Sequence, residues 1–189
     1  MRGRLLYIVG ASGVGKDSVL NWVKAHLPTD TRVHFCKRAI TRPANAGAET
    51  HESLTAQEFA AALDHGEFAM HWQAHGLDYG IRNSIHDELT KGTTVVVSGS
   101  RAYLPTLRQR FPSAEIIQIV ANPQILRARL EARAREDAKA IDERLARAAA
   151  FVLPNDLPIH VISNDGAIEV AGRALLNRIT QPTSISALG

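Results

Sequence analysis

The chain has 189 residues, of which 45% are hydrophobic and 22% are charged, and its formal net charge is +3. This size suits one α/β domain that buries its core without disulfides, and the single cysteine, Cys36, excludes an internal disulfide and fits a reducing compartment. No apolar run approaches the length of a membrane-spanning helix, which excludes a membrane protein, so we expect a cytoplasmic one.

The first expected elements are a strand, a glycine-rich loop and a helix. Apolar residues 5–9 predict a buried strand, and residues 19–27 have the apolar spacing of a helix. Between them lies the pattern G-x-x-x-x-G-K, whose backbone N–H groups and lysine can cradle phosphate oxygens. We therefore predict a phosphate-binding loop, made of Gly10, Ala11, Ser12, Gly13, Val14, Gly15, Lys16, Asp17 and Ser18.

Asp17 stands where a phosphate-binding loop normally has the Ser or Thr that ligates magnesium. A carboxylate beside phosphates is repulsive unless a cation lies between them, so Asp17 indicates metal mediation, directly or through water. Ser18 is the rival ligand, but it lies about 100° further round the helix. Asp17 is therefore the predicted magnesium residue.

A basic segment, residues 37–43, follows a short expected strand at 31–36. It is either a solvated loop or a phosphate grip for a second substrate. Guanidinium groups match phosphate oxygens as bidentate donors, and the preceding phosphate loop favours a second, phosphorylated substrate. We therefore favour the grip, with Arg38 and Arg42 as its residues.

The next segment is expected to be a small α/β insertion that carries the acceptor. Thr55 and Glu58 form a capping box, which predicts a helix over 55–63, and residues 68–72 and 78–81 predict a hairpin. Tyr79 in the hairpin either hydrogen-bonds a phosphate or simply packs. The spacing of the nearby histidines does not fit a metal site, so we interpret them as surface or ligand-contact residues: His65, His71 and His75.

The remaining elements continue the alternation of strands and helices. Residues 93–98 predict a buried parallel strand, but it ends in Ser98, Ser100 and Arg101 where many phosphate-loop proteins have an acidic magnesium residue. This absence strengthens the prediction for Asp17. We further expect helices at 102–111 and 167–179 and strands at 115–120 and 160–163. This alternation implies a parallel sheet with right-handed crossovers.

Residues 124–150 contain many arginines among acidic residues. Mixed charge on exposed helices is the ordinary explanation. The helical apolar rhythm nevertheless breaks at 133–137 and resumes near Ala140, which is the pattern of a helix-loop-helix lid. Such a lid can bring arginines onto a transferring phosphoryl group.

The chain resembles the guanylate kinase family of nucleoside monophosphate kinases over nearly its whole length. The resemblance rests on the phosphate loop, on Ile40-Thr41-Arg42-Pro43, on Gly66-Glu67-Phe68, on His75-Gly76 with Tyr79-Gly80, and on Arg133 and Arg144. It implies a three-layer phosphate-loop kinase fold, with a parallel sheet flanked by helices, an acceptor-binding insertion and a helical lid. It also implies ATP and Mg²⁺ as cofactors.

Two departures argue against guanine as the acceptor base. Met70 occupies the place of the family's guanine-reading glutamate, and a thioether cannot accept hydrogen bonds as a carboxylate does. Ser98 and Ser100 replace aspartates. Gly-Lys-Asp-Ser in the phosphate loop and the segments 40–49 and 97–101 also resemble the corresponding parts of ribose 1,5-bisphosphate phosphokinases. Those enzymes make phosphoribosyl pyrophosphate in phosphonate catabolism.

This second resemblance implies a phosphosugar acceptor, whose pocket needs cations and neutral polar groups. We expect the acceptor to be bound by Arg38, Arg42, Tyr79, Ser98, Ser100 and Arg101. Lys16 and the backbone N–H groups of the phosphate loop would bind ATP. Arg133 and Arg144 would bind the transferring group, with Arg135 as a further lid partner. The resemblance also implies that Asn164, in the loop after the last strand, lies beside adenine; the alternative is that it is an ordinary helix cap.

We expect one domain over 1–180, with a core at 1–36, 90–122 and 158–180, an insertion at about 37–89 and a lid at about 124–150; residues 181–189 are expected to fray.

The rival functions are a nucleoside monophosphate kinase and an inert guanylate-kinase-like binding module. Nucleic-acid binding ranks last because the basic residues form two local groups rather than one stripe. The expected partner is a small phosphosugar, with no membrane, and a homodimer is left open.

Overall fold

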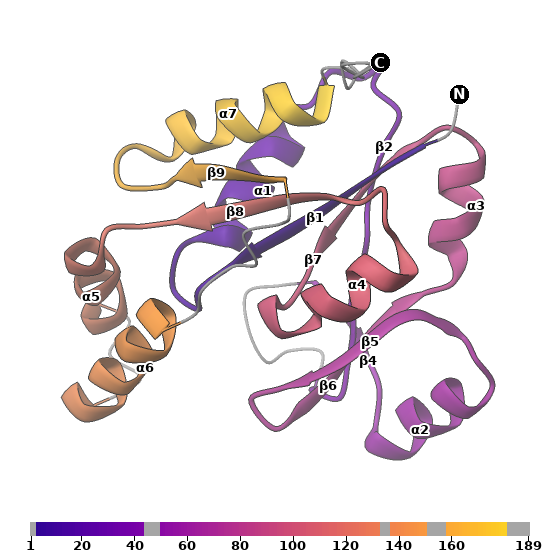
Figure 1. Cartoon of the computed structure of the whole chain (residues 1–189), viewed down its shortest axis with the longest axis horizontal. Helices are drawn as coiled ribbons and strands as arrows, with labels where there is room; N and C mark the ends of the chain where they lie inside the picture. Colours follow the sequence, from indigo (N-terminus) through magenta and orange to yellow (C-terminus); the bar gives the residue numbers. More distant parts are fainter. Residues whose placement is uncertain (1–2, 44–49, 133–136, 151–157, 181–189) are drawn as a thin grey trace. The chain divides into compact units, whose positions relative to one another are not determined.

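The computed structural model describes residues 3–43, 50–132, 137–150 and 158–180, and Figure 1 shows its elements. The strands are β1 (Arg4–Gly10), β2 (Val33–Phe35), β3 (Ala39–Ile40), β4 (Glu52–Ser53), β5 (Phe68–Ala74), β6 (Leu77–Arg82), β7 (Thr94–Ser98), β8 (Glu115–Val120) and β9 (Ile159–Ser163). The helices are α1 (Lys16–His26), α2 (Ala56–Asp64), α3 (Ser84–Thr90), the 3₁₀ turn η1 (Arg101–Tyr103), α4 (Leu104–Arg110), α5 (Pro123–Ala132), α6 (Ala138–Ala150) and α7 (Ile168–Thr180).

The architecture is α/β, as the alternation of strands and helices predicts. A five-stranded sheet has the order β2-β7-β1-β8-β9, and β7 pairs in parallel with both β1 and β2. The chain divides into two compact units. The first unit comprises residues 1–10, 32–118 and 152–160, and the second comprises 11–31, 119–151 and 161–189.

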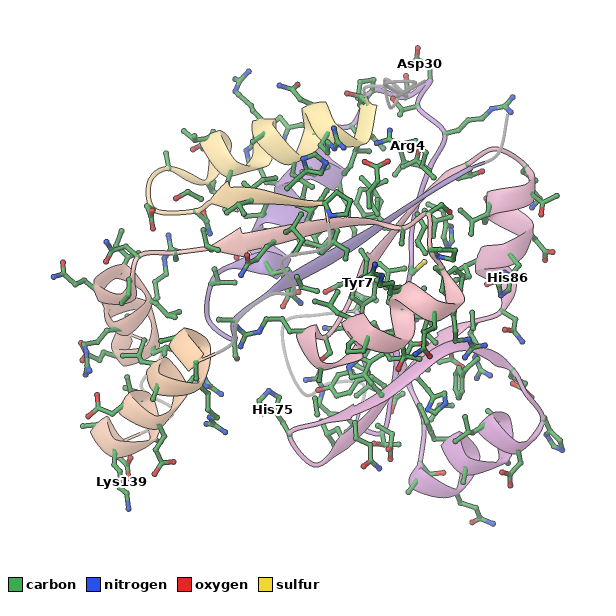
Figure 2. The ribbon with its side chains drawn as sticks, viewed as in Figure 1. Arg4, Tyr7, Asp30, His75, His86 and Lys139 are labelled. Carbon is green, nitrogen blue, oxygen red and sulfur yellow. The ribbon has the colours of Figure 1, made fainter. Side chains whose placement is uncertain are left out.

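The centre of the five-stranded sheet is apolar on both faces. In β1 the side chains from Leu6 to Val9 are completely buried, and β7 carries three buried valines. Such continuous apolar runs are typical of parallel strands that are covered on both sides. At the start of β1, Arg4 (labelled in Figure 2) binds Glu115 of β8 through two hydrogen bonds of 2.8 and 3.1 Å.

A second, four-stranded sheet belongs to the first unit and has the order β4-β3-β6-β5. The predicted hairpin is present as β5 and β6, and positive φ angles at His75 (+52°) and Gly76 (+71°) give the two-residue turn its shape (His75 is labelled in Figure 2). The predicted capping box is also present, because Thr55 and Glu58 each bind the other's backbone N–H. Phe59 of α2 stacks on Phe68 of β5, which joins the helix to the sheet.

The structure differs from the sequence prediction within the basic segment 37–43. Two apolar residues there, Ala39 and Ile40, are fully buried as strand β3, which pairs with β4 on one side and β6 on the other. A two-residue strand between cations has no periodicity that a sequence pattern can detect. The helix expected over 102–111 also begins differently, with the 3₁₀ turn η1 before α4, whose first turn contains a proline.

In the second unit, helix α1 packs along helix α7. The contact is close at Gly172, where an added Cβ would lie 2.2 Å from the indole ring of Trp22. Helices α5 and α6 share a small apolar cluster that contains Leu126, Leu130 and Ile141. No helix in the described ranges combines the length and apolar character needed to cross a bilayer.

Candidate active site

The loop after β1 has the backbone shape of a phosphate cradle. Gly13 and Gly15 have φ angles of +95° and +89°, a region that side-chain-bearing residues rarely adopt. Helix α1 begins directly after Gly15, so the N–H groups of its first turn face the loop without a side-chain cap. This concentration of donors, together with the helix dipole, favours an anion.

Helix α5 and the loop after β9 pack against this cradle, and all three belong to the second unit. A Cβ on Gly13 would lie 2.8 Å from Leu130 of α5, and one on Gly15 would lie 2.5 Å from the amide nitrogen of Asn164. That same amide donates a 2.8 Å hydrogen bond to the carbonyl oxygen of Val14. Glycine is therefore needed at both positions for two reasons, the positive φ angle and the close neighbours. The motif alone does not reveal the second reason.

The predicted site residues of the loop lie at the start of α1. Lys16 is partly buried, whereas Asp17 and Ser18 are exposed in the first turn. An exposed carboxylate at this place fits Mg²⁺, which is typically held by one or two carboxylates together with substrate phosphates. Within the described ranges no three His, Cys, Asp or Glu side chains gather as a protein-only metal site.

Asn164 is almost completely buried, at 2% exposure, and its oxygen Oδ1 has no hydrogen-bond partner among the described residues. Its neighbour Asp165 accepts hydrogen bonds of 2.5 Å from the backbone N–H of Asn122 and from the Ser163 hydroxyl. These bonds hold the pKa of the Asp165 carboxyl below its usual range. The Asn164-Asp165 loop thus joins the end of β9 to the phosphate loop and to the start of α5.

The first unit contains the residues predicted to bind the acceptor. The Arg38 guanidinium lies over the Tyr79 ring, 5.4 Å from its centroid, and Tyr79 in turn stacks on Trp72 at 5.7 Å with an interplanar angle of 2°. Trp72 contacts a further ring, Tyr103, at 5.8 Å. Tyr79 therefore packs extensively, and its stacked ring supports the arginine that the sequence assigns to phosphate.

Arg42, the second predicted phosphate arginine, lies two residues after the end of β3. Its carbonyl oxygen accepts hydrogen bonds from His51 (3.1 Å) and Ser53 (2.7 Å), and its guanidinium lies 3.5 Å from the other ring nitrogen of His51. The sequence contains no motif that marks His51, and only its burial beside Arg42 reveals it.

The end of β7 brings together Ser98, Ser100 and Arg101. Tyr7 (labelled in Figure 2) fixes the Ser100 backbone, because its hydroxyl accepts from the Ser100 N–H at 2.9 Å and donates to the Ser100 carbonyl at 3.2 Å. Burial raises the pKa of Tyr7, so the hydroxyl stays protonated as this pairing requires. Burial also lowers the pKa of the partly buried Arg101.

Met70 is completely buried in β5, in register with Ile81 of β6. A buried thioether offers no hydrogen-bond acceptor of carboxylate strength. The position that a guanine-reading glutamate would occupy by the resemblance is thus part of the apolar core.

The arginines that the sequence predicts for a lid are only partly described. Arg144 lies on α6, partly buried, while Arg133 and Arg135 fall outside the described residues. Helices α5 and α6 are joined by their apolar cluster and by an ion pair between Arg127 and Asp142. Figure 2 shows Lys139 near the beginning of α6.

No protein-family model matches the chain. Among curated proteins, it is 43% identical to ribose 1,5-bisphosphate phosphokinase PhnN of Thiobacillus denitrificans, over 94% of this chain and 93% of that protein. It is 38% identical to the protein of that name from Agrobacterium fabrum, over 96% of this chain and 99% of the relative. The relative of that name from Janthinobacterium is 45% identical but much longer, and the chain spans 39% of its length.

Solved structures show the same fold at much lower identity. A guanylate kinase from Anaplasma phagocytophilum matches with a TM-score of 0.66 and 19% identity, over 96% of this chain and 88% of that one. A sugar kinase from Janibacter matches with a TM-score of 0.52, also at 19% identity, over 93% of each chain. These likenesses confirm the predicted phosphate-loop kinase fold.

Proposed function

The chain belongs to the ribose 1,5-bisphosphate phosphokinase family, and from this premise we propose that it transfers the γ-phosphoryl group of ATP to ribose 1,5-bisphosphate. The products are 5-phospho-α-D-ribose 1-diphosphate and ADP, in phosphonate catabolism. The observation that carries this proposal is the pairing of a phosphate-loop fold with an acceptor region in which the base-reading position, Met70, is buried.

The donor side of the reaction uses the second unit. Lys16 and the backbone N–H groups from Gly13 to Ser18 bind the ATP phosphates, and Asp17 holds Mg²⁺ directly or through water. Magnesium, when bound, neutralises charge on the β- and γ-phosphate oxygens. Asn164 holds the loop in shape through Val14, which keeps the N–H donors oriented before ATP arrives.

The acceptor side uses the first unit. Arg38, supported on Tyr79, and Arg42, held by His51, bind the phosphates of the sugar. Ser98, Ser100 and Arg101 supply neutral and cationic groups at the end of β7. A sugar bisphosphate presents anionic ends and hydroxyls but no base, and this set of side chains matches that chemistry.

The reaction itself needs little from general acid–base catalysis. An oxygen of the sugar 1-phosphate is already ionised at neutral pH, and it attacks the γ-phosphorus while the bond to the β–γ bridging oxygen breaks. ADP leaves with that bonding electron pair, so no proton has to move. The protein's contribution is positioning and charge neutralisation, with Lys16, Arg133 and Arg144 on the transferring group and Arg135 as an additional lid arginine.

The remaining expectations belong to the same proposal. Residues 37–89 act as the acceptor-binding insertion and 124–150 as a lid within one kinase domain over 1–180. The tail expected at 181–189 lies outside the described residues. The protein works in the cytoplasm and does not bind nucleic acid. A homodimer remains a prediction that light scattering of the purified protein tests.

The deciding experiment compares acceptors with purified protein, ATP and magnesium. We expect phosphoryl transfer to ribose 1,5-bisphosphate to exceed transfer to GMP or AMP, with the diphosphate product identified by ³¹P NMR. Lys16→Met is the matched control, because it removes the phosphate-binding charge. Preference for a nucleotide would instead indicate a nucleoside monophosphate kinase, and no turnover with any acceptor would indicate a binding module.

A further inference from the structure

His51 is a buried histidine whose two ring nitrogens both face the same arginine. The residue is 5% exposed and immediately precedes β4. Its Nε2 atom lies 3.1 Å from the carbonyl oxygen of Arg42, and its Nδ1 atom lies 3.5 Å from the Nη2 atom of the Arg42 guanidinium. A carbonyl only accepts and a guanidinium only donates, so in these two contacts Nε2 donates and Nδ1 accepts.

The backbone around Arg42 is fixed from several directions. Its carbonyl also accepts from the Ser53 hydroxyl at 2.7 Å, and its N–H donates to Ile40 at 2.8 Å. The preceding residue, Thr41, exchanges two hydrogen bonds of 2.9 and 3.1 Å with the backbone of Asp78. The segment that carries Arg42 is therefore held between the beginning of β6 and strand β4.

Strand β4, which follows His51, is itself anchored. Glu52 accepts hydrogen bonds of 2.5 and 3.2 Å from Arg82 at the end of β6. Arg82 also binds Glu67 and lies over the Phe68 ring, 4.8 Å from its centroid. His51 thus adjoins a strand whose position is fixed, and it can transmit that position to Arg42.

Within the described part of the chain, the guanidinium of Arg42 has unmet hydrogen-bonding capacity. Its Nε atom is buried and has no hydrogen-bond partner among the described residues. A buried N–H without an acceptor is costly, and an anion that binds the guanidinium would remove this cost. An arginine side chain also loses considerable rotamer entropy on binding, unless something holds it beforehand.

We propose that His51 is a positioning residue for acceptor binding, which holds Arg42 in the orientation that meets the acceptor phosphate. This inference rests on the proposed function, since Arg42 is taken to bind a phosphate of ribose 1,5-bisphosphate. His51 acts through Arg42 and does not itself touch the substrate.

A double-mutant cycle tests this role, with KM for ribose 1,5-bisphosphate as its main readout. His51→Leu keeps a similar volume but removes both polar contacts, and we expect this KM to rise about tenfold, while kcat and KM for ATP stay within about twofold. His51→Gln offers a donor and an acceptor at its end and should restore most of the affinity. In an Arg42→Lys background, His51→Leu should add less than about a twofold effect.

Two results would overturn the inference: the His51→Leu effect persisting in full in the Arg42→Lys background, or His51→Gln binding the acceptor as poorly as His51→Leu. His65→Ala is the control, because the His65 side chain is 75% exposed. If His51→Leu does not fold, as thermal unfolding would show, His51→Asn takes its place, since its amide is too short to reach the Arg42 carbonyl. The effect of His51→Asn on KM for the acceptor is then compared with and without Arg42→Lys, and an undiminished effect in the Arg42→Lys background would again overturn the inference.

Failure of the proposed function has a separate signature. If wild-type protein prefers a nucleotide acceptor, ribose 1,5-bisphosphate is the wrong substrate, and the cycle is run with KM for that nucleotide. Non-additivity there would still support the positioning role, because Arg42 would still bind a phosphate. Wild-type protein without transfer to any acceptor would contradict both proposals.

Discussion

The side-chain amide of Asn164 donates a hydrogen bond to the main-chain carbonyl of Val14 across a separation of 150 residues. It thereby connects the loop after β9 to the middle of the phosphate-binding loop. The amide nitrogen also occupies the space that a side chain at Gly15 would need. The geometry of the phosphate loop therefore depends on a residue far away in the sequence.

Replacing Asn164 by Ala should weaken nucleotide binding without changing base preference. Loss of the bond to Val14 relaxes the loop, and we expect KM for ATP and for GTP to rise by the same factor, about tenfold. Steady-state kinetics with both nucleotides measure this. Asn177→Ala, at an exposed position of α7, is the control. A rise confined to ATP would show instead that Asn164 recognises adenine.

Asp17→Asn should lower turnover by about tenfold or more and raise the magnesium concentration needed for half-maximal activity, because it removes an oxyanion ligand. A magnesium titration of activity measures this. Asp30→Asn is the matched control, since Asp30 is exposed and lies in the loop after α1 (Figure 2). An unchanged magnesium requirement would mean that Asp17 only complements the helix N-terminus.

Tyr79 should act through its ring rather than its hydroxyl. Because the ring contacts both Trp72 and Arg38, Tyr79→Leu should raise KM for the acceptor about fivefold, whereas Tyr79→Phe should stay within about twofold of wild type. Kinetics with varied acceptor at saturating ATP compare the two variants. Equal impairment of both would assign the hydroxyl to the phosphate.

Gly172→Ala should destabilise the fold. The new Cβ would lie 2.2 Å from the Trp22 ring, so α1 and α7 would have to separate. We expect a loss of about 1–3 kcal/mol in the free energy of unfolding, seen as a lower Tm by calorimetry. Gly166→Ala is the control, because nothing lies within 4 Å of an added Cβ there. Equal melting of both variants would contradict close packing at Gly172.

Cys36 should be unreactive in the folded protein. Burial, together with the charge of Glu88, raises the pKa of its thiol to about 12, so the thiolate is scarce at neutral pH. A chromogenic disulfide reagent at pH 8 should label the native protein far more slowly than the urea-unfolded protein. Cys36→Ser serves as the blank. Similar rates in both states would show that the thiol is accessible and ionised.

The local elements of the fold follow largely from the sequence. The strand, glycine loop and helix at the N-terminus, the capping box of Thr55 and Glu58, and the hairpin of β5 and β6 lie where their patterns place them. Each depends on residues only a few positions apart, whose spacing fixes the hydrogen bonds directly. The kinase family, too, was recognisable from short motifs.

The supporting contacts were decided only by the tertiary structure. Asn164 under the phosphate loop, His51 beside Arg42, Tyr7 on Ser100 and the short strand β3 have no spacing or composition that announces them. A lone histidine, asparagine or tyrosine is compatible with many environments, and its role depends on which backbone carbonyl or guanidinium the folded chain brings within about 3 Å. Sequence patterns report neighbours along the chain, whereas these side chains act on residues that only folding makes their neighbours.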